Sequence, residues 1–188
     1  FWPGPLTLIL EKKEDSKIKS ILSNNKKFVG CRVPNHPIAQ DLLKNLAFPI
    51  AAPSANISTK LSSTKISHLS KKLKENVFIL DGGETLCGLE STVIDVINDK
   101  NNILRLGSIS FEKIKKIVPN INIENKNLSK LSPGQYLKHY SPSKPIRINI
   151  NSVLKDESLL NFGSNNLKSN IKELNLSPSG NLEEAAKN

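Results

Sequence analysis

The sequence predicts a mixed α/β (α+β) fold in which a twisted mixed sheet is flanked by helices. Two observations support this fold class. Apolar runs of strand length alternate along the first two thirds of the chain with segments whose apolar residues recur at helical spacing. The chain also has 188 residues, of which 37% are hydrophobic, so it carries enough apolar material for a buried core. A sheet covered by helices is the architecture that such an alternation favours.

Apolar runs in the first 124 residues predict the strands of this sheet. They are dense in leucine, isoleucine and valine. The predicted strands are residues 6–10, 28–33, 49–52, 77–80, 92–97 and 103–106.

The helix with the strongest signal is predicted over residues 36–46. Pro37 stands at its first helical position, and a stripe of isoleucine and leucine follows on one face. Residues 65–73 and 111–118 carry weaker helical patterns. Near the end of the chain, Asn181 is a good N-cap with Glu184 in the capping-box position, which predicts that another helix begins there.

The apolar pattern divides the chain into three parts. Residues 1–124 form the α/β domain, and residues 125–144 are interpreted as a linker because the pattern lapses there into Ser-Pro-Gly-Gln and His-Tyr-Ser-Pro. Residues 145–188 begin a second unit with a predicted strand at 145–150. The sequence contains no methionine and opens on Phe-Trp-Pro, so we interpret it as an internal piece of a longer protein.

Composition excludes some classes of protein. No apolar run approaches the roughly 18–20 residues of a membrane-spanning helix. Two cysteines do not make a disulfide scaffold and fit reduced thiols of the cytoplasm better. The 27 basic against 17 acidic residues give a net charge of +10, which permits weak contact with tRNA or other RNA. Only three basic residues are arginine, however, and scattered surface lysines explain the charge more simply.

A set of hydroxyl, amide and arginine side chains stands at predicted strand ends and turns. Arg32 ends one strand and Arg105 another, Ser54 and Asn56 follow an apolar run, and a glycine-bearing loop leads into Ser91. Such groups suit an anionic substrate such as a nucleotide, with catalysis by positioning and charge stabilisation. We identify no side chain as a catalytic acid, base or nucleophile, and the three histidines show no metal-ligand spacing.

Five short motifs in order carry a resemblance to a known family. They are PGPLTLIL at 3–10, RVPNHP at 32–37, PSANIS at 53–58, GLESTVID at 88–95 and LRLG at 104–107. Together they resemble the YrdC-like domain of the threonylcarbamoyl-AMP synthase family. The sequence SPGQYLKHYSP at 132–142 resembles the linker of the longer, two-domain members. The sequence NLSPSGNLEEAA at 175–186 resembles part of their Rossmann-like second domain.

The resemblance implies a nucleotidyltransferase. L-threonine, bicarbonate and ATP would give threonylcarbamoyl-adenylate and pyrophosphate, with Mg²⁺ held mainly by the phosphates. A tRNA-modifying transferase complex in the cytoplasm would use this product to make threonylcarbamoyladenosine at position 37 of tRNA (t6A37). The family's N-terminal basic motif would precede Phe1, so we expect the isolated polypeptide to be inactive.

The resemblance also implies which residues bind the substrates. L-threonine would be held by Arg32, Ser54 and Ser91. ATP would be contacted by Phe28 (through its backbone), Asn56, Thr64, Arg105 and Tyr140. Tyr140 lies in the linker, which would close over the nucleotide as a lid that excludes water.

Two other functions fit parts of the sequence. One is a YrdC-like protein that binds RNA without synthesising anything, which the basic charge permits but the scarcity of aromatic residues disfavours. The other is a related domain that makes a carbamoyl-adenylate without specificity for threonine.

Overall fold

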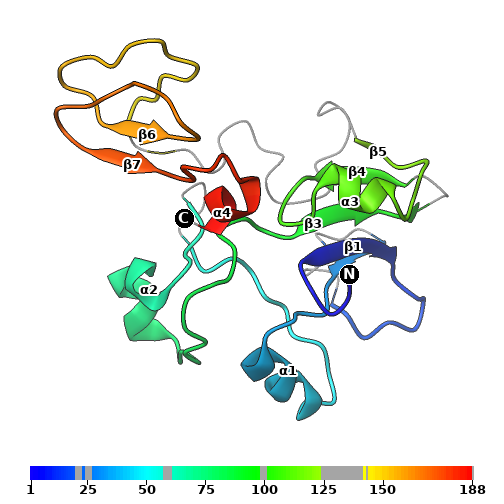
Figure 1. The fold of residues 1–188 in the computed structure, drawn as a ribbon. Coiled ribbons are helices and arrows are strands. Elements are labelled where there is room, and N and C mark those ends of the chain that lie inside the picture. The colour runs from blue at the N-terminus through cyan, green and yellow to red at the C-terminus, as the bar shows by residue number, and fades with distance from the viewer. Residues whose placement is uncertain are drawn as a thin grey trace.

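The first part of the chain is built on a five-stranded mixed sheet (Figure 1). The computed structural model describes residues 1–19, 23, 27–56, 61–97, 101–123, 142 and 144–187. The strand order is β2-β1-β3-β4-β5. The strands are β1 (Leu6–Glu11), β2 (Phe28–Cys31), β3 (Thr92–Asp95), β4 (Asn102–Arg105) and β5 (Asn122–Ile123).

The strand directions bring four chain segments to the same edge of the sheet. Strand β1 runs antiparallel to β2 and parallel to β3, with Leu6 opposite Thr92. Strand β4 runs antiparallel to β3, with Val93 opposite Arg105, and parallel to β5. The beginnings of β1 and β3 therefore lie beside the ends of β2 and β4.

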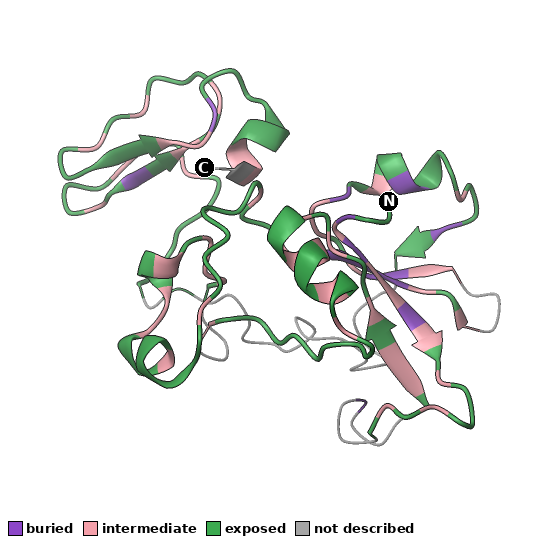
Figure 2. Cartoon of the chain, turned by 90° about the horizontal axis from the view of Figure 1, so that it is seen from below, coloured by how far each residue is buried: buried purple, intermediate pink, exposed green. Residues whose placement is uncertain are grey.

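Side chains on the two faces of the sheet form two buried clusters. The larger joins the sheet to α3 (Phe111–Lys115) through Ile114, which is 2% exposed, and contains Leu6, Ile94, Ile103, Ile109, Ile114 and Ile121. The smaller consists of Ile9, Val93 and Leu104. Figure 2 shows that the buried residues gather in the central strands and near α3. The predicted sheet and the predicted helix at 111–118 are confirmed in this region, the helix with a shorter span.

The other two helices of this part bury no side chain, which differs from the prediction of a sheet flanked by several helices. The predicted helix at 36–46 exists as α1 (Pro37–Lys44), but its apolar stripe stays partly exposed. The predicted helix at 65–73 is divided into a 3₁₀ turn at Ile66–His68 and the helix α2 (Lys71–Asn76). The hydroxyl of Ser70 accepts a hydrogen bond from the Leu73 backbone and starts α2, which explains the division.

Three predicted strands are wrong. Residues 49–52 and 77–80 are mostly exposed and pair with no strand in the part of the chain that the structure describes. Pro49 and Pro53 bracket the first of these runs, and proline lacks the backbone donor that a sheet requires. Residues 145–150 are not a strand either, and Asn149 within them adopts a left-handed conformation, with φ 54°, that a regular strand does not contain.

The second unit contains a short parallel pair of strands followed by a helix. Strand β6 (Leu159–Asn161) pairs with β7 (Glu173–Asn175), and α4 (Leu182–Lys187) comes next. The prediction that Asn181 is the N-cap of α4 is confirmed, since its side chain accepts from the backbone of Glu183 at 2.8 Å and of Glu184 at 3.0 Å. The predicted capping-box role of Glu184 is wrong, because the Asn181 N–H donates to the Ser177 hydroxyl at 2.8 Å instead. The Glu184 carboxylate bonds the hydroxyls of Ser177 and Ser179. Nearly all of the predicted linker at 125–144 lies outside the described residues.

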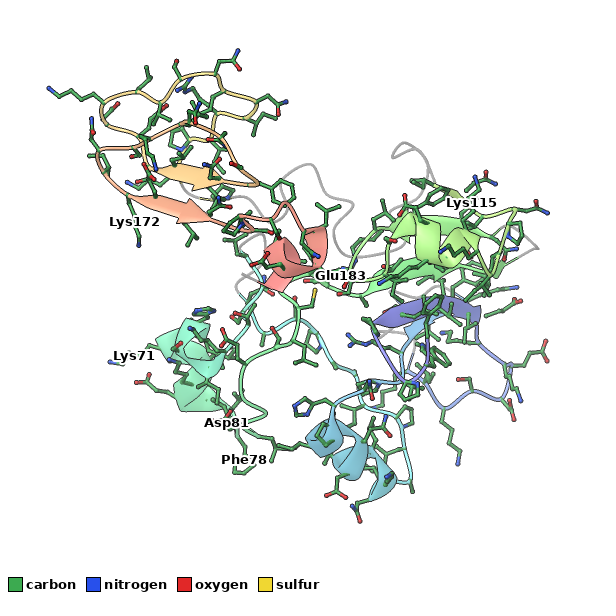
Figure 3. All side chains as sticks on the ribbon, in the orientation of Figure 1. Lys71, Phe78, Asp81, Lys115, Lys172 and Glu183 are labelled. Carbon is green, nitrogen blue, oxygen red and sulfur yellow. The ribbon has the colours of Figure 1, made fainter. Side chains whose placement is uncertain are left out.

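Helix α4 contacts the first part of the chain. Glu183, labelled in Figure 3, accepts from the ammonium group of Lys113 at 2.6 Å. The backbone carbonyl of Ala186 accepts from the Gly88 N–H at 2.8 Å. A Cβ atom on Gly88 would lie 3.2 Å from that carbonyl oxygen, so the contact is close. None of the helices in the described ranges combines the length and apolar character needed to cross a bilayer.

Thr92→Val is expected to lower the free energy of unfolding by about 2–3 kcal/mol, because it leaves buried backbone groups without their partner. Thr92 is fully buried, its hydroxyl donates to the Ile109 carbonyl at 2.8 Å, and it accepts from the backbone of Gly107 and Ile109. Urea unfolding of the full-length protein measures the change. Thr92→Ser, which keeps the hydroxyl, is the control, and equal losses in the two variants would contradict the assignment.

The carboxyl group of Glu157 is expected to titrate near pH 2. Hydrogen bonds from Arg147, at 2.6 and 2.5 Å, and from the Leu154 backbone lower its pKa from 4.5 to about 2. A lowered carboxyl pKa means that this group stabilises the folded state above about pH 4.5 and that the stabilisation is lost as the pH falls toward 2. A carbonyl-detected NMR titration measures the midpoint. Arg147→Gln should return it toward 4.5, and an unchanged midpoint would rule out Arg147 as the cause of the low pKa.

Candidate active site

The candidate site is centred on Ser91, which directly precedes β3. Its side chain is largely buried, at 7% exposed, and its hydroxyl lies 2.7 Å from the hydroxyl of Thr7 in β1. The parallel pairing of β1 with β3 explains this contact, because Leu6 stands opposite Thr92. Two hydroxyls from distant parts of the sequence thus lie side by side at one edge of the sheet.

Arg105, the last residue of β4, crosses over Ser91. Its Nε and Nη2 atoms donate to the Ser91 carbonyl at 3.1 and 2.9 Å, and Nη2 also lies 3.2 Å from the Ser91 hydroxyl. Its Nη1 atom forms an ion pair with the Glu90 carboxylate. The Arg105 side chain is only 15% exposed, so these bonds hold a partly desolvated guanidinium in a fixed orientation.

Arg32 follows β2 and lies near the same edge. Its Nε donates to the Gly4 carbonyl at 3.0 Å, and the Gly4 N–H donates to the Val33 carbonyl at 2.8 Å, so the turn before β1 holds the arginine. Partial burial of the guanidinium and the positive charge of Arg105 lower the pKa of Arg32, although the residue as a whole is exposed. An anion between the two arginines would relieve this unfavourable electrostatic interaction.

Hydrogen bonds connect two loops to this edge. The Ser62 hydroxyl donates to the Glu90 carboxylate at 2.7 Å, and the Ser63 hydroxyl donates to the Ala55 carbonyl at 3.2 Å. The Thr64 carbonyl accepts from the Thr85 N–H at 2.8 Å. The segments that carry Asn56 and Thr64 are thereby joined to the segment that carries Ser91.

The structure brings some of the predicted site residues together and leaves others apart. Arg32, Ser91 and Arg105 meet at one edge of the sheet. Thr64 is joined to them through the loop bonds above, and its hydroxyl lies 3.2 Å from the His68 ring. Asn56 lies next to Ala55 with its side-chain oxygen buried, and Ser54 is exposed in the same loop.

Two predicted ATP residues are not part of this group. Phe28 begins β2, opposite Glu11, so it stands at the far end of the strand from Arg32 and packs against the smaller core cluster. Four residues of strand separate the two by about 13 Å. Tyr140 lies outside the described residues.

Glu90 and Ser62 belong to the site but were not predicted from the sequence. The GLESTVID motif contains the signal that could have identified Glu90. It places a carboxylate directly beside Ser91, in a predicted site otherwise made of arginines, hydroxyls and amides. Ser62 gave no comparable signal, because its contact with Glu90 spans 28 residues.

The second unit contains a surface hollow that is separate from the strand-edge site. A surface hollow of about 340 Å³ in the second unit is lined by side chains around β6 and β7, among them Asn161, Lys168 and Asn175, and contains none of the predicted site residues. At the strand-edge site, in contrast, the hydroxyls of Thr7 and Ser91 and the guanidinium of Arg105 converge. Within the described ranges, no three or more His, Cys, Asp or Glu side chains are arranged to hold a metal ion.

Comparisons with known proteins agree with the resemblance seen in the motifs. Residues 1–107 match the profile of the Sua5/YciO/YrdC family, which carries the description telomere recombination. Over 153 residues the chain is 39% identical to a threonylcarbamoyl-AMP synthase of Bacillus subtilis, and over 152 residues it is 40% identical to one of Pyrococcus abyssi. The alignments cover 79% and 78% of this chain, and the chain spans 44% of the length of each relative.

Solved structures give the same result. The crystal structure of P. abyssi Sua5 complexed with L-threonine matches all of this chain with a TM-score of 0.79 and 32% identity, over 60% of the Sua5 chain. Escherichia coli YciO matches 59% of this chain with a TM-score of 0.51 and 28% identity, over 54% of the YciO chain. With a family profile that covers more than half of the chain, and with strand-edge residues that fall in the family's motifs, the chain belongs to the Sua5/YciO/YrdC family.

Proposed function

We propose that this protein is a threonylcarbamoyl-AMP synthase. Its substrates would be L-threonine, bicarbonate and ATP, and its products threonylcarbamoyl-adenylate and pyrophosphate. The observation that carries the proposal is the convergence of Arg32, Ser91 and Arg105 at one sheet edge, in a chain 39–40% identical to named synthases. A relative solved with L-threonine adds support for the amino-acid substrate.

Threonine would bind on the side of Arg32. A guanidinium matches the two oxygens of a carboxylate, so Arg32 would hold the threonine carboxylate. Ser91 and Ser54 would hydrogen-bond other polar groups of the amino acid through their hydroxyls. The Gly4 carbonyl restrains the Arg32 side chain, which lowers the entropy cost of binding.

ATP would bind on the side of Arg105, Asn56 and Thr64. The proposal also includes the Phe28 backbone and Tyr140, the latter as part of the linker lid. Mg²⁺ would neutralise phosphate charge and be held mainly by ATP. The residues present fit a metal that the nucleotide holds. The carboxylate of Glu90, which lies beside Arg105, is already bonded by Arg105 and Ser62, so the phosphates would supply most of the metal ligands.

The proposed chemistry needs alignment and charge stabilisation from this chain. The threonine amine attacks bicarbonate to give an N-linked carbamate with loss of water. A carbamate oxygen then attacks the α-phosphorus, and the bond from that phosphorus to the β-phosphate bridging oxygen breaks, releasing pyrophosphate. Arg32 and Arg105 would stabilise the negative charge shared among these groups. Excluding water would protect the adenylate from hydrolysis.

The wider setting is part of the proposal. A tRNA-modifying transferase complex in the cytoplasm would receive the adenylate and form t6A37, with weak contact between this protein and the RNA. Residues 145–188 would begin a Rossmann-like second domain, for which the parallel β6–β7 pair followed by α4 offers support. The proposed domain limits are residues 1–124, 125–144 and 145–188.

Arg32→Ala is expected to reduce kcat/KM for threonine at least tenfold, since a charge-assisted hydrogen bond is worth about 1.5–3 kcal/mol. The assay follows pyrophosphate release by the full-length protein with ATP, Mg²⁺, L-threonine and bicarbonate, omitting threonine or bicarbonate in turn. Arg147→Ala is a matched control, because Arg147 bonds Glu157 in the second unit.

The synthase is supported if pyrophosphate release requires both threonine and bicarbonate, and if it falls in Arg32→Ala but not in Arg147→Ala. Release that is indifferent to threonine favours a carbamoyl-adenylate domain with another acceptor. No release from a folded protein that binds RNA favours the RNA-binding alternative, and either of these results contradicts the proposal.

A further inference from the structure

Glu90 is a partly buried carboxylate, with its side chain 24% exposed, at the centre of a site that would bind an anion. We propose that Glu90 is a positioning residue for the nucleotide: it fixes the Arg105 guanidinium and the segment 62–64 relative to each other. The identity of the nucleotide as ATP rests on the proposed function. Glu90 itself would not touch the reacting atoms.

The two carboxylate oxygens of Glu90 bind different parts of the chain. Oε2 accepts from Nη1 of Arg105 at the end of β4. Oε1 accepts from the Ser62 hydroxyl at 2.7 Å. Glu90 therefore links a sheet-edge arginine to a loop that is 28 residues earlier in the sequence.

Both groups joined by Glu90 lie next to proposed ATP contacts. Ser62 is two residues before Thr64, whose carbonyl accepts from the Thr85 backbone. On its other side, Arg105 donates from Nε and Nη2 to the Ser91 carbonyl. With Glu90 on one side and Ser91 on the other, the plane of the guanidinium is fixed before a ligand arrives, and preorganisation of this kind increases affinity.

The negative charge of Glu90, in addition to its hydrogen bonds, would help to hold the Arg105 guanidinium in place. Arg32 and Arg105 carry like charges that repel each other, and the pKa of Arg32 is lowered first by partial burial of its guanidinium and then by the positive charge of Arg105. A carboxylate on Arg105 offsets part of this repulsion, whereas a neutral amide of the same size would not. Replacing Glu90 by glutamine therefore weakens the restraint on Arg105 and lets its guanidinium turn away from Arg32.

The threonine side of the site is also held by contacts that do not involve Glu90, although Arg105 bonds the Ser91 carbonyl and hydroxyl as well. The Ser91 hydroxyl lies 2.7 Å from the Thr7 hydroxyl, and the sheet pairing of β1 with β3 holds the two together. Arg32 is held by the Gly4 carbonyl. Loss of the Glu90 charge should accordingly affect the nucleotide more than threonine.

The test compares Glu90→Gln and Ser62→Ala with the unchanged full-length protein. Glu84→Gln is the matched control, because Glu84 lies in the same loop and forms an exposed ion pair with Lys65, 3.9 Å apart. Steady-state pyrophosphate release gives KM for ATP and for threonine separately. Calorimetry with α,β-methylene-ATP measures nucleotide affinity without turnover, and the melting temperature reports folding.

For Glu90→Gln we expect KM for ATP and the Kd of the analogue to rise about tenfold, which corresponds to about 1.4 kcal/mol. Ser62→Ala should cause a smaller rise of the same kind, because only one of the two bonds is lost. KM for threonine and the melting temperature should stay close to those of the unchanged protein. This separation distinguishes positioning of Arg105 from general loss of structure.

Unchanged nucleotide affinity in Glu90→Gln overturns the proposal, as does an equal loss in Glu84→Gln or an equal rise in both KM values. If Glu90→Gln does not fold, Ser62→Ala decides by the same criteria. If the unchanged protein releases no pyrophosphate that depends on threonine, the proposed function fails, and the analogue affinities still test Glu90. A protein that does not bind the analogue at all overturns both.

Discussion

The arrangement of the site depends on the close approach of residues 90–92 to residues 105–109. The buried Thr92 hydroxyl holds the two segments together by bonding the backbone of Gly107 and Ile109. Gly107 is required for this approach, since a Cβ atom there would lie 2.2 Å from the Glu90 carbonyl oxygen. Arg105 can reach both Glu90 and Ser91 only because these backbones are in contact, so the electrostatics of the edge follow from the packing.

Strand direction explains why residues from distant parts of the sequence share this edge. Arg32 directly follows β2 and Arg105 is the last residue of β4, and both of these strands end there. Thr7 lies at the beginning of β1 and Ser91 directly precedes β3, and both of these strands begin there. Each antiparallel pair therefore supplies one arginine and one hydroxyl: β2 with β1, and β4 with β3. This alternation places positive charge next to neutral donors, and Glu90 adds one negative charge beside Arg105. The edge suits anions that also have groups able to hydrogen-bond, as phosphates and amino-acid carboxylates do.

The sequence predicted β1, β2, β3 and β4 of the sheet, because their apolar residues enter or pack against the two core clusters. It did not predict β5, which is only two residues long and exposed. It also placed Arg32, Ser91 and Arg105 at predicted strand ends, and the structure brings these three residues to one edge of the sheet, while their roles in binding stay predictions. The strands predicted at residues 49–52 and 77–80 are wrong, because these apolar segments pair with no strand among the described residues. Local composition does not reveal whether a partner strand is available. The role of Glu90 was missed for the same reason: its contact with Ser62 depends on loop placement and not on spacing.

The loop before β3 is restrained from several directions, and this links the second unit to the site. Thr85 bonds the Thr64 carbonyl, Gly88 bonds the Ala186 carbonyl of α4, and Glu90 bonds Arg105. Only one residue separates Gly88 from Glu90. The 2.8 Å bond from Gly88 to α4 therefore restrains the backbone close to Glu90 and Ser91. The exposed Lys113–Glu183 ion pair joins the same helix to α3, so α4 contacts the first part of the chain both at α3 and at the loop that leads into the strand edge.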